Sequence, residues 1–229
     1  MSELGHVTVV APNREQSAVG HAITLSDPLR VDEINRSNGF KGFSVDGTPS
    51  DCVKIATQAL LEVEPNVIVS GINLGSNTGT NIIYSGTVSA ATEGTMLKIP
   101  SVAVSLNSFE SRDFAGAKKA AKTVVSHVLE KGLPEKTLLN VNVPAIPENE
   151  LKGYKITQQG NVAFRDSFEK RVDPKGRVYY WMTGQMFDPD EEPNMDHNAV
   201  MDNFVSISPI HYRLTNHDFL DELKSWDLS

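Results

Sequence analysis

The chain has 229 residues, a formal net charge of −8 and one cysteine, Cys52, so no internal disulfide can form. An acidic chain of this kind lacks the basic face that binds a nucleic-acid polymer, although backbone N–H groups can still hold a small anion. No apolar run reaches the roughly 20 residues that cross a bilayer, and residues 1–6 lack the features of a secretory signal, so we expect no membrane partner and a cytoplasmic location.

The first predicted elements are short strands and a capped helix. The β-branched run 7–12 ends at a proline and predicts a strand buried on both faces. Residues 42–47 predict another short strand. Thr48 then predicts an N-cap with Pro49 at the first helical position, in a helix that runs to about Leu61.

The middle of the chain combines strands with a loop rich in glycine and asparagine. A strand predicted at 66–70 opens into the loop 71–81, whose residue types tolerate left-handed backbone angles and close approach to a ligand. Residues 84–88 follow this loop, and a helix is predicted from there to about Lys98. The polar loop 13–17, called the Ser17 loop below, likewise follows the predicted strand 7–12. Both loops therefore come directly after predicted strands.

Further alternation of strands and helices defines the fold class. Residues 100–106 and 138–143 predict strands, with a helix over 114–131 between them. This order predicts an α/β, Rossmann-like fold with a mostly parallel sheet that is covered by helices. Ligands of such sheets bind beyond the carboxyl ends of the strands, so we expect the two loops to share one edge.

The pattern changes after residue 144. Residues 176–184 predict one strand of a projecting β-hairpin, and 188–196 an acidic, proline-containing loop. Its acidic segment 188–192 is most simply solvated. A short strand is expected at 205–210 and a C-terminal helix at 218–226.

These elements suggest two parts, a phosphate-binding core over 1–145 and an appendage over 146–229 that includes a late core strand. A hairpin that projects from an α/β core cannot bury two faces alone. We therefore expect a homo-oligomer, with dimer and tetramer both open.

The strongest sign of phosphate binding is the run Ser85, Gly86 and Thr87 at a predicted helix start. Unpaired N–H groups, two hydroxyls and the positive end of the helix dipole converge there. The alternative is an ordinary N-cap, for which serine and threonine are also favoured.

Three other loop residues could complete the site. Asn73 offers a neutral oxygen that a hard divalent cation accepts, and Asn77 could donate to phosphate oxygens. Ser17 could add its hydroxyl to the oxygen shell of the cation. Asparagines are also common turn formers, and an exposed loop serine is common without any function.

Other chemistries lack their motifs. The sequence has neither the dinucleotide-binding glycine fingerprint nor the P-loop motif, which disfavours an NAD-type oxidoreductase. His211 and His217 are expected to be structural or interfacial. The two site loops contain no carboxylate beyond Glu15, although Mg²⁺ and Mn²⁺ normally require anionic oxygen ligands.

Five segments together resemble the SurE (survival protein E) nucleotidase family, in the family's order and over nearly the whole chain. They are 9–17 (VVAPNREQS), 47–53 (GTPSDCV), 69–77 (VSGINLGSN), 84–91 (YSGTVSAA) and 205–211 (VSISPIH).

The resemblance implies a Rossmann-like phosphatase that uses a divalent metal, Mg²⁺ or Mn²⁺, to remove the 5′ or 3′ phosphate of nucleoside monophosphates. It assigns Ser17 and Asn73 to metal-ligand positions, and it assigns Asn77, Ser85, Gly86 and Thr87 to phosphate-binding positions. It also implies an oligomer built through the hairpin and the C-terminal helix. The hypothesis is in-line hydrolysis, with the cation activating water and the helix start neutralising developing charge.

The sequence differs from the family pattern at the start of the chain. The family begins with a buried strand that runs into an Asn-Asp-Asp-Gly loop, and residues 1–6 match only the end of the helix after it. We therefore expect the acidic metal ligands to be missing from this sequence and leave the catalytic residues unassigned. The alternative function is a catalytically impaired nucleotide-binding subunit or fragment, and an in-frame Asn-Asp-Asp-Gly run in the upstream DNA would favour the enzyme.

Overall fold

The computed structural model describes residues 1–36, 40–187 and 192–228. The strands are β1 (Val9–Pro12), β2 (Val31–Asn35), β3 (Lys41–Val45), β4 (Ile68–Leu74), β5 (Ser101–Asn107), β6 (Thr137–Pro144), β7 (Tyr154–Ile156), β8 (Ala163–Val172), β9 (Val178–Phe187) and β10 (Val205–His211). The α-helices are α1 (Pro49–Ile55), α2 (Gly86–Met96), α3 (Ala115–Lys131), α4 (Asp196–Met201) and α5 (Leu220–Lys224). None of the helices in this described part is long and apolar enough to cross a membrane.

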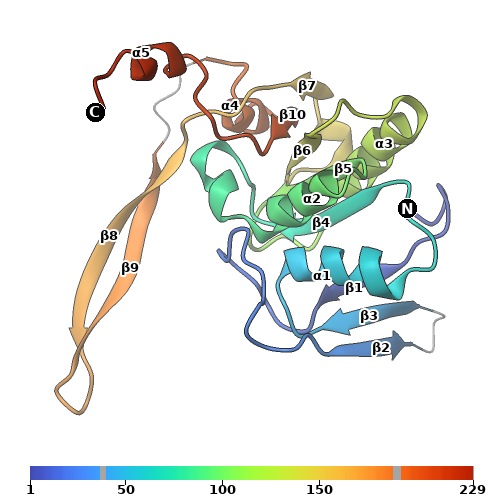
Figure 1. The fold of residues 1–229 in the computed structure, drawn as a ribbon, viewed down its shortest axis with the longest axis horizontal. Helices are drawn as coiled ribbons and strands as arrows, with labels where there is room; N and C mark the ends of the chain where they lie inside the picture. Colours follow the sequence, from blue (N-terminus) through green and yellow to red (C-terminus); the bar gives the residue numbers. More distant parts are fainter. Residues whose placement is uncertain (37–39, 188–191, 229) are drawn as a thin grey trace.

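The centre of the fold is a five-stranded sheet in the order β4-β5-β6-β10-β7 (Figure 1). Strands β4, β5 and β6 run parallel, whereas β10 is antiparallel to β6. Successive residues of a strand face opposite sides of its sheet. Accordingly, Val102 and Val104 pack in the cluster that contains the buried face of α3, while Ala103 packs with Val88 of α2. Helices therefore cover both faces, and the predicted α/β fold is confirmed.

A second, three-stranded sheet has the order β1-β3-β2. Within the described residues the strands form three sheets, and the third is the β8-β9 hairpin. The sequence predicted the hairpin but placed the remaining strands in one sheet. Strand β1 is parallel to β3, but its residues alternate between exposed and half-buried, and Val9 is 37% exposed. The prediction of a first strand buried on both faces is therefore wrong, because the described structure pairs β1 on one side only.

Helix α1 begins as its sequence predicts. The Thr48 hydroxyl accepts from the Asp51 N–H, and the Asp51 carboxylate accepts from the Thr48 N–H, which completes a capping box with Pro49 in the first turn. A π-helical turn over Ala56–Leu60 extends the element close to the predicted end at Leu61. The capping box makes the start of α1 rigid.

Several boundaries differ from the sequence prediction. Strand β4 continues through Leu74 and so includes four residues that were expected to begin a loop, and it is only half-buried. Strands β2 and β7 and helix α4 were not predicted. Strand β7 has three residues, too few to show a period.

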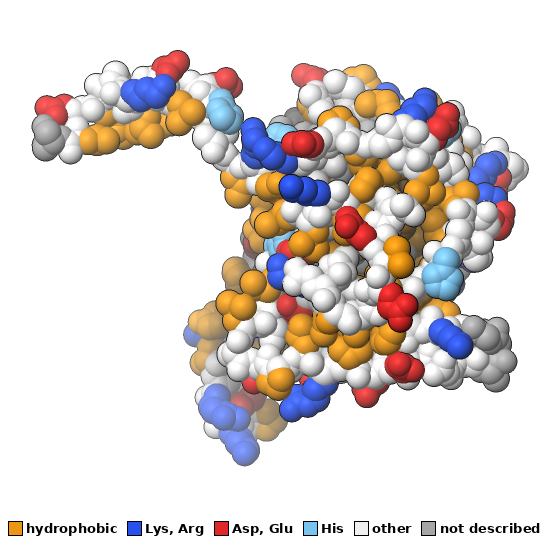
Figure 2. All heavy atoms as spheres, turned by 45° about the vertical axis from the view of Figure 1, so that its right-hand side comes forward, with side chains coloured by type: hydrophobic (Ala, Val, Ile, Leu, Met, Phe, Trp, Pro, Cys, Tyr) orange, Lys and Arg blue, Asp and Glu red, His pale blue; other side chains and the backbone are white. Residues whose placement is uncertain are grey.

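The appended segments contribute to both the core and the projections. Strands β10 and β7 join the central sheet, while β8 and β9 form an antiparallel hairpin that projects from the body (Figure 1). The C-terminal segment with α5 also extends away, and apolar side chains gather on its underside (Figure 2). Exposed apolar residues on these projections are Phe168, Tyr180, Trp181, Met182, Trp226 and Leu228. The division at residue 145 stays a prediction, since both parts share one sheet.

Candidate active site

The start of helix α2 has the geometry of an anion site. The Ser85 hydroxyl accepts from the Val88 N–H at 3.1 Å, so Ser85 is the N-cap that the sequence offered as the alternative. The N–H groups of Gly86 and Thr87 lie in the first helical turn, where no helical carbonyl can pair with them. The Thr87 hydroxyl has no hydrogen-bond partner among the described side chains and backbone groups. Two N–H groups, one hydroxyl and the helix dipole are therefore available to an anion.

The glycine at position 86 allows other segments to approach the start of α2 closely. A Cβ atom there would lie 3.0 Å from Pro49 Cγ, 3.3 Å from Val19 Cγ2 and 3.4 Å from the Gln16 carbonyl oxygen. The Gly20 N–H also donates to the Tyr84 carbonyl at 2.9 Å. The loop that carries Ser17 therefore packs directly against the start of α2.

Asn77 is buried and fixed by the sheet. Its N–H donates to Asn142 Oδ1 at 2.7 Å, and its Nδ2 lies 2.7 Å from Ser105 Oγ. Because the Ser105 hydroxyl can donate or accept, turning the Asn77 amide over preserves this bond and leaves its NH₂ group free for a phosphate. The side chains of Asn140 and Asn142 both donate to the Asn77 carbonyl, which holds its backbone in place.

Asn73 lies at the carboxyl end of β4. Its Nδ2 donates to the carbonyls of Leu74 and Gly75 at 3.0 and 2.8 Å, so the amide nitrogen is occupied and its oxygen faces away from those bonds. Asn73 pairs in register with Ser105, and Ser105 pairs with Asn142. Asn73, Ser105 and Asn142 therefore lie in one row across three parallel strands, and the last two contact Asn77.

Ser17 is exposed, and its hydroxyl donates to Glu15 Oε1 at 2.6 Å. Ser17 Oγ and Asn73 Oδ1 are the two neutral oxygens that the sequence assigned to a divalent cation. No group of three or more His, Cys, Asp or Glu residues within the described ranges could hold a metal ion. Hard cations require anionic oxygen ligands, so the described donor set does not fit a complete metal site.

Comparisons with known proteins identify the family of the chain. The family model described as Survival protein SurE matches residues 1–166. The chain belongs to the SurE family. The 5'-nucleotidase SurE of Syntrophobacter fumaroxidans is 46% identical over 222 residues, which cover 97% of this chain and 89% of that protein.

Two other SurE proteins extend the comparison. The 5'-nucleotidase SurE of Pelotomaculum thermopropionicum is 48% identical over 98% of this chain and 86% of its own length. The crystal structure of the SurE protein from Aquifex aeolicus matches with a TM-score of 0.84 at 41% identity, and covers 97% of this chain and 89% of that one. The resemblance predicted from the five motifs is therefore confirmed.

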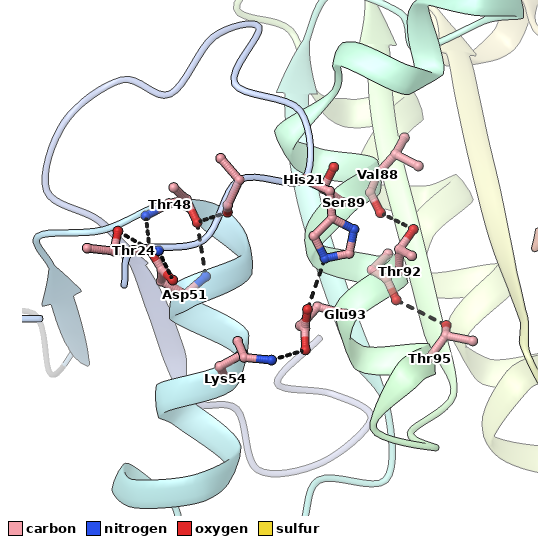
Figure 3. A network of polar contacts seen from close by, with 12 residues as sticks. His21, Thr24, Thr48, Asp51, Lys54, Val88, Ser89, Thr92, Glu93 and Thr95 are labelled. Carbon is pink, nitrogen blue, oxygen red and sulfur yellow. Dashed lines mark hydrogen bonds and ion pairs between the residues drawn. The ribbon is translucent and has the colours of Figure 1, made fainter. Parts of the chain in front are cut away.

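A buried polar network of this SurE chain was missed by the sequence reasoning. Glu93 of α2 contacts His21 of the Ser17 loop and Lys54 of α1, and Asp51 accepts from the backbone N–H and hydroxyl of Thr24 (Figure 3). Burial opposes ionisation of both carboxyls, but the surrounding hydrogen bonds outweigh it and hold the pKa of Glu93 and of Asp51 below their ordinary values. The signal in the sequence was a single charged residue in a helix otherwise made of small, apolar and hydroxyl-bearing residues.

Asp196 anchors the other side of the 71–81 loop. Its carboxylate is fully buried and accepts from the N–H groups of Gly79, Gly160 and His197. Burial raises the pKa of Asp196, and the three N–H donors only partly oppose this. The sequence placed Asp196 at the end of an acidic loop and did not predict its burial. The segment that was expected to be solvated is 188–192, of which residues 188–191 lie outside the described part.

The two C-terminal histidines lie far along the sheet from the α2 site. His211 and His217 line a hollow of about 430 Å³ with Lys136 and Arg213, next to Thr137 at the beginning of β6. The candidate phosphate site lies instead near the carboxyl ends of the parallel strands. Cavity size alone would therefore point away from the residues that can bind phosphate.

Proposed function

We propose that this SurE chain is a metal-dependent nucleoside monophosphate phosphohydrolase that releases inorganic phosphate from the 5′ position. The substrate class comes from the relatives named 5'-nucleotidase SurE. The observation that carries the proposal within this chain is the free start of α2, where Gly86 and Thr87 present N–H groups beside an unpaired hydroxyl.

The residues of the chain have separate tasks in this proposal. Gly86 and Thr87 bind the phosphate oxygens, and the α2 dipole stabilises the negative charge that develops on them. Asn77 adds one donor from a backbone that Asn140 and Asn142 keep rigid. Ser85 acts through the helix, since its hydroxyl caps the Val88 N–H and keeps the first turn in shape.

The proposed cofactor is Mg²⁺ or Mn²⁺, with Ser17 and Asn73 as neutral ligands. The described residues provide no complete set of anionic ligands for this cation. The measurement is phosphate release from 5′- and 3′-nucleoside monophosphates with each metal and with EDTA. Release from 5′ substrates that EDTA abolishes supports the proposal, and equal release with EDTA contradicts metal dependence.

A second candidate function follows from the same shortage of carboxylates. A chain with the phosphate site and without acidic metal ligands would bind nucleoside monophosphates and leave them intact. Calorimetric titration with AMP distinguishes the two, because binding without phosphate release favours the nucleotide-binding subunit.

We also propose a homo-oligomer assembled through the hairpin and the C-terminal helix. The exposed aromatic and aliphatic side chains of β8, β9 and the α5 segment support it, because large exposed apolar patches commonly mark protein interfaces. The proposed location is the cytoplasm, an expectation that rests on the sequence alone.

A further inference from the structure

A buried carboxylate joins three elements around the candidate site. The Glu93 side chain is 3% exposed; its Oε1 accepts from Lys54 Nζ at 2.7 Å, and its Oε2 lies 2.9 Å from His21 Nε2 (Figure 3). Glu93 belongs to α2, Lys54 to α1 and His21 to the loop over residues 13–30 that carries Ser17. One side chain therefore connects α2, the helix whose start is the candidate phosphate site, to two neighbouring segments.

This arrangement depends on both partners. A carboxylate inside a protein is costly unless it is paired and hydrogen-bonded, and removal of one partner leaves part of its charge uncompensated. Burial opposes ionisation of Glu93, but the hydrogen bonds with Lys54 and His21 outweigh it and hold the pKa of Glu93 below its ordinary value. His21 and Lys54 are 32% and 39% exposed, so either can be replaced with little loss of core packing.

The loop has few other attachments close to Ser17. The Gly20 N–H donates to the Tyr84 carbonyl, immediately before the Ser85 cap. The Ala22 carbonyl accepts from the Thr48 hydroxyl at 2.7 Å, and Thr24 donates to Asp51, so both of these bonds attach the loop to α1 and not to α2. His21 lies between Gly20 and Ala22 in the sequence. Loss of the bond from His21 to Glu93 would leave the stretch from Ser17 to Gly20 held at α2 mainly by one backbone bond and by the contacts of Val19 and Gln16 with Gly86.

We propose that Glu93 is a positioning residue, which holds the Ser17 loop against the phosphate-binding start of α2 through His21 and fixes α1 through Lys54. The proposal rests on the proposed function, because it assigns these contacts to the geometry of that site. Glu93 does not touch the substrate; it sets where the loop lies relative to Gly86 and Thr87.

The test combines hydrogen exchange with kinetics on the full chain. The variants are His21→Ala, which removes one partner at a partly exposed position, and Glu93→Gln, which keeps the shape and removes the charge. Glu148→Gln is the matched control, since Glu148 forms a surface ion pair with Lys119 of α3 away from the site. Exchange is followed in peptides that cover residues 16–24 and, as a measure of global unfolding, in the buried strand β5.

The expected result is local and kinetic. In His21→Ala the amides of 16–24 exchange about five-fold faster or more while β5 is unchanged, as local opening requires. The kcat for AMP falls about ten-fold and KM changes less than about three-fold, because the phosphate ligands of α2 remain and only the loop is misplaced. Glu93→Gln should show the same pattern, and Glu148→Gln should match the wild type.

Two results would overturn the proposal: unchanged exchange in residues 16–24 of His21→Ala, or a freed loop with unchanged kcat and KM. A merely structural role would lower the melting temperature of both variants and leave kcat unchanged well below it. A wild-type chain without AMP hydrolysis would contradict the proposed function alone, and the exchange rates would still decide whether Glu93 holds the loop.

Discussion

Some hydroxyl and amide groups near the candidate site form hydrogen bonds within the protein, and others remain available to bind an anion. Ser85 and Thr87 are two residues apart, yet the Ser85 hydroxyl is used within the helix cap and the Thr87 hydroxyl is unpaired among the described residues. Asn77 is held by its backbone and keeps one face of its amide available. Residue type alone therefore overstates the number of phosphate ligands, and Thr87 and Asn77 carry the direct side-chain contacts in this account.

Asp51 provides a prediction about acid stability. Its folded pKa lies below the ordinary value, so its stabilising effect is complete above the unfolded pKa of about 3.9 and is lost as the pH falls through the folded pKa. Asp51→Asn should lower the free energy of unfolding by about 2 kcal/mol at pH 7, and the difference should shrink at pH 3. Urea unfolding at both pH values measures this, with exposed Asp202→Asn as the control. An equal deficit at both pH values would contradict it.

The sequence predicted candidate site residues but not the contacts that hold them in place. Glycine, serine and threonine at a helix start and asparagines in a loop are visible as residue types next to predicted strands. Their supports are far apart in the sequence: His21 is 72 residues from Glu93, and Lys54 is 39 residues from Glu93. The packing of α1 on α2 brings them together. Contacts of this kind depend on tertiary structure and leave no local pattern.

At the scale of elements, strand β4 passes close to β5 at Gly71, two residues before the candidate site residue Asn73. Gly71 has φ of +123°, and a Cβ atom there would lie 2.3 Å from the Val104 carbonyl oxygen of β5. The register between β4 and β5 shifts between Ser70 and Asn73. The glycine is therefore required both by its backbone angle and by the approach of β5.

Gly71→Ala should lower the free energy of unfolding by about 2 kcal/mol or more, because neither the backbone nor β5 can make room cheaply. Gly132→Ala is the control: Gly132 has φ of +70° and ψ of −174°, but no atom lies within 4 Å of the added Cβ, so backbone strain acts without a clash, at about 1–3 kcal/mol. Urea unfolding measures both. A smaller loss for Gly71→Ala than for Gly132→Ala would contradict the role of the β5 contact.

Strong local signals predicted most of the elements. The Thr48 capping box and the buried run of β5 appear where the sequence placed them, because caps and apolar periods are encoded within a few residues. Strand β4 was predicted too short because Gly71 and Asn73 look like loop residues, although the pairing with β5 resumes at Asn73 after a register shift that includes Gly71. The separation of β1, β2 and β3 into their own sheet depends on long-range pairing that the strand sequences do not specify.

For the whole molecule, the hairpin provides a prediction about assembly. Phe168 and Met182 are register partners, so they share one face, and both are more than half exposed. Phe168→Ser with Met182→Ser should shift the mass measured by light scattering from a multiple of 25.0 kDa toward a single chain. Lys175→Ser in the hairpin turn is the control. A wild-type chain that is monomeric at all concentrations would contradict the proposed oligomer.

The most direct test of the central claim is phosphate release from AMP with Mg²⁺ or Mn²⁺ by the wild-type chain and by a variant with both Thr87→Ala and Asn77→Ala. The account predicts release by the wild type and a loss of about 100-fold or more in kcat/KM for the variant, with the fold retained in circular dichroism. Near-normal turnover in the double variant would show that the start of α2 is not the phosphate site.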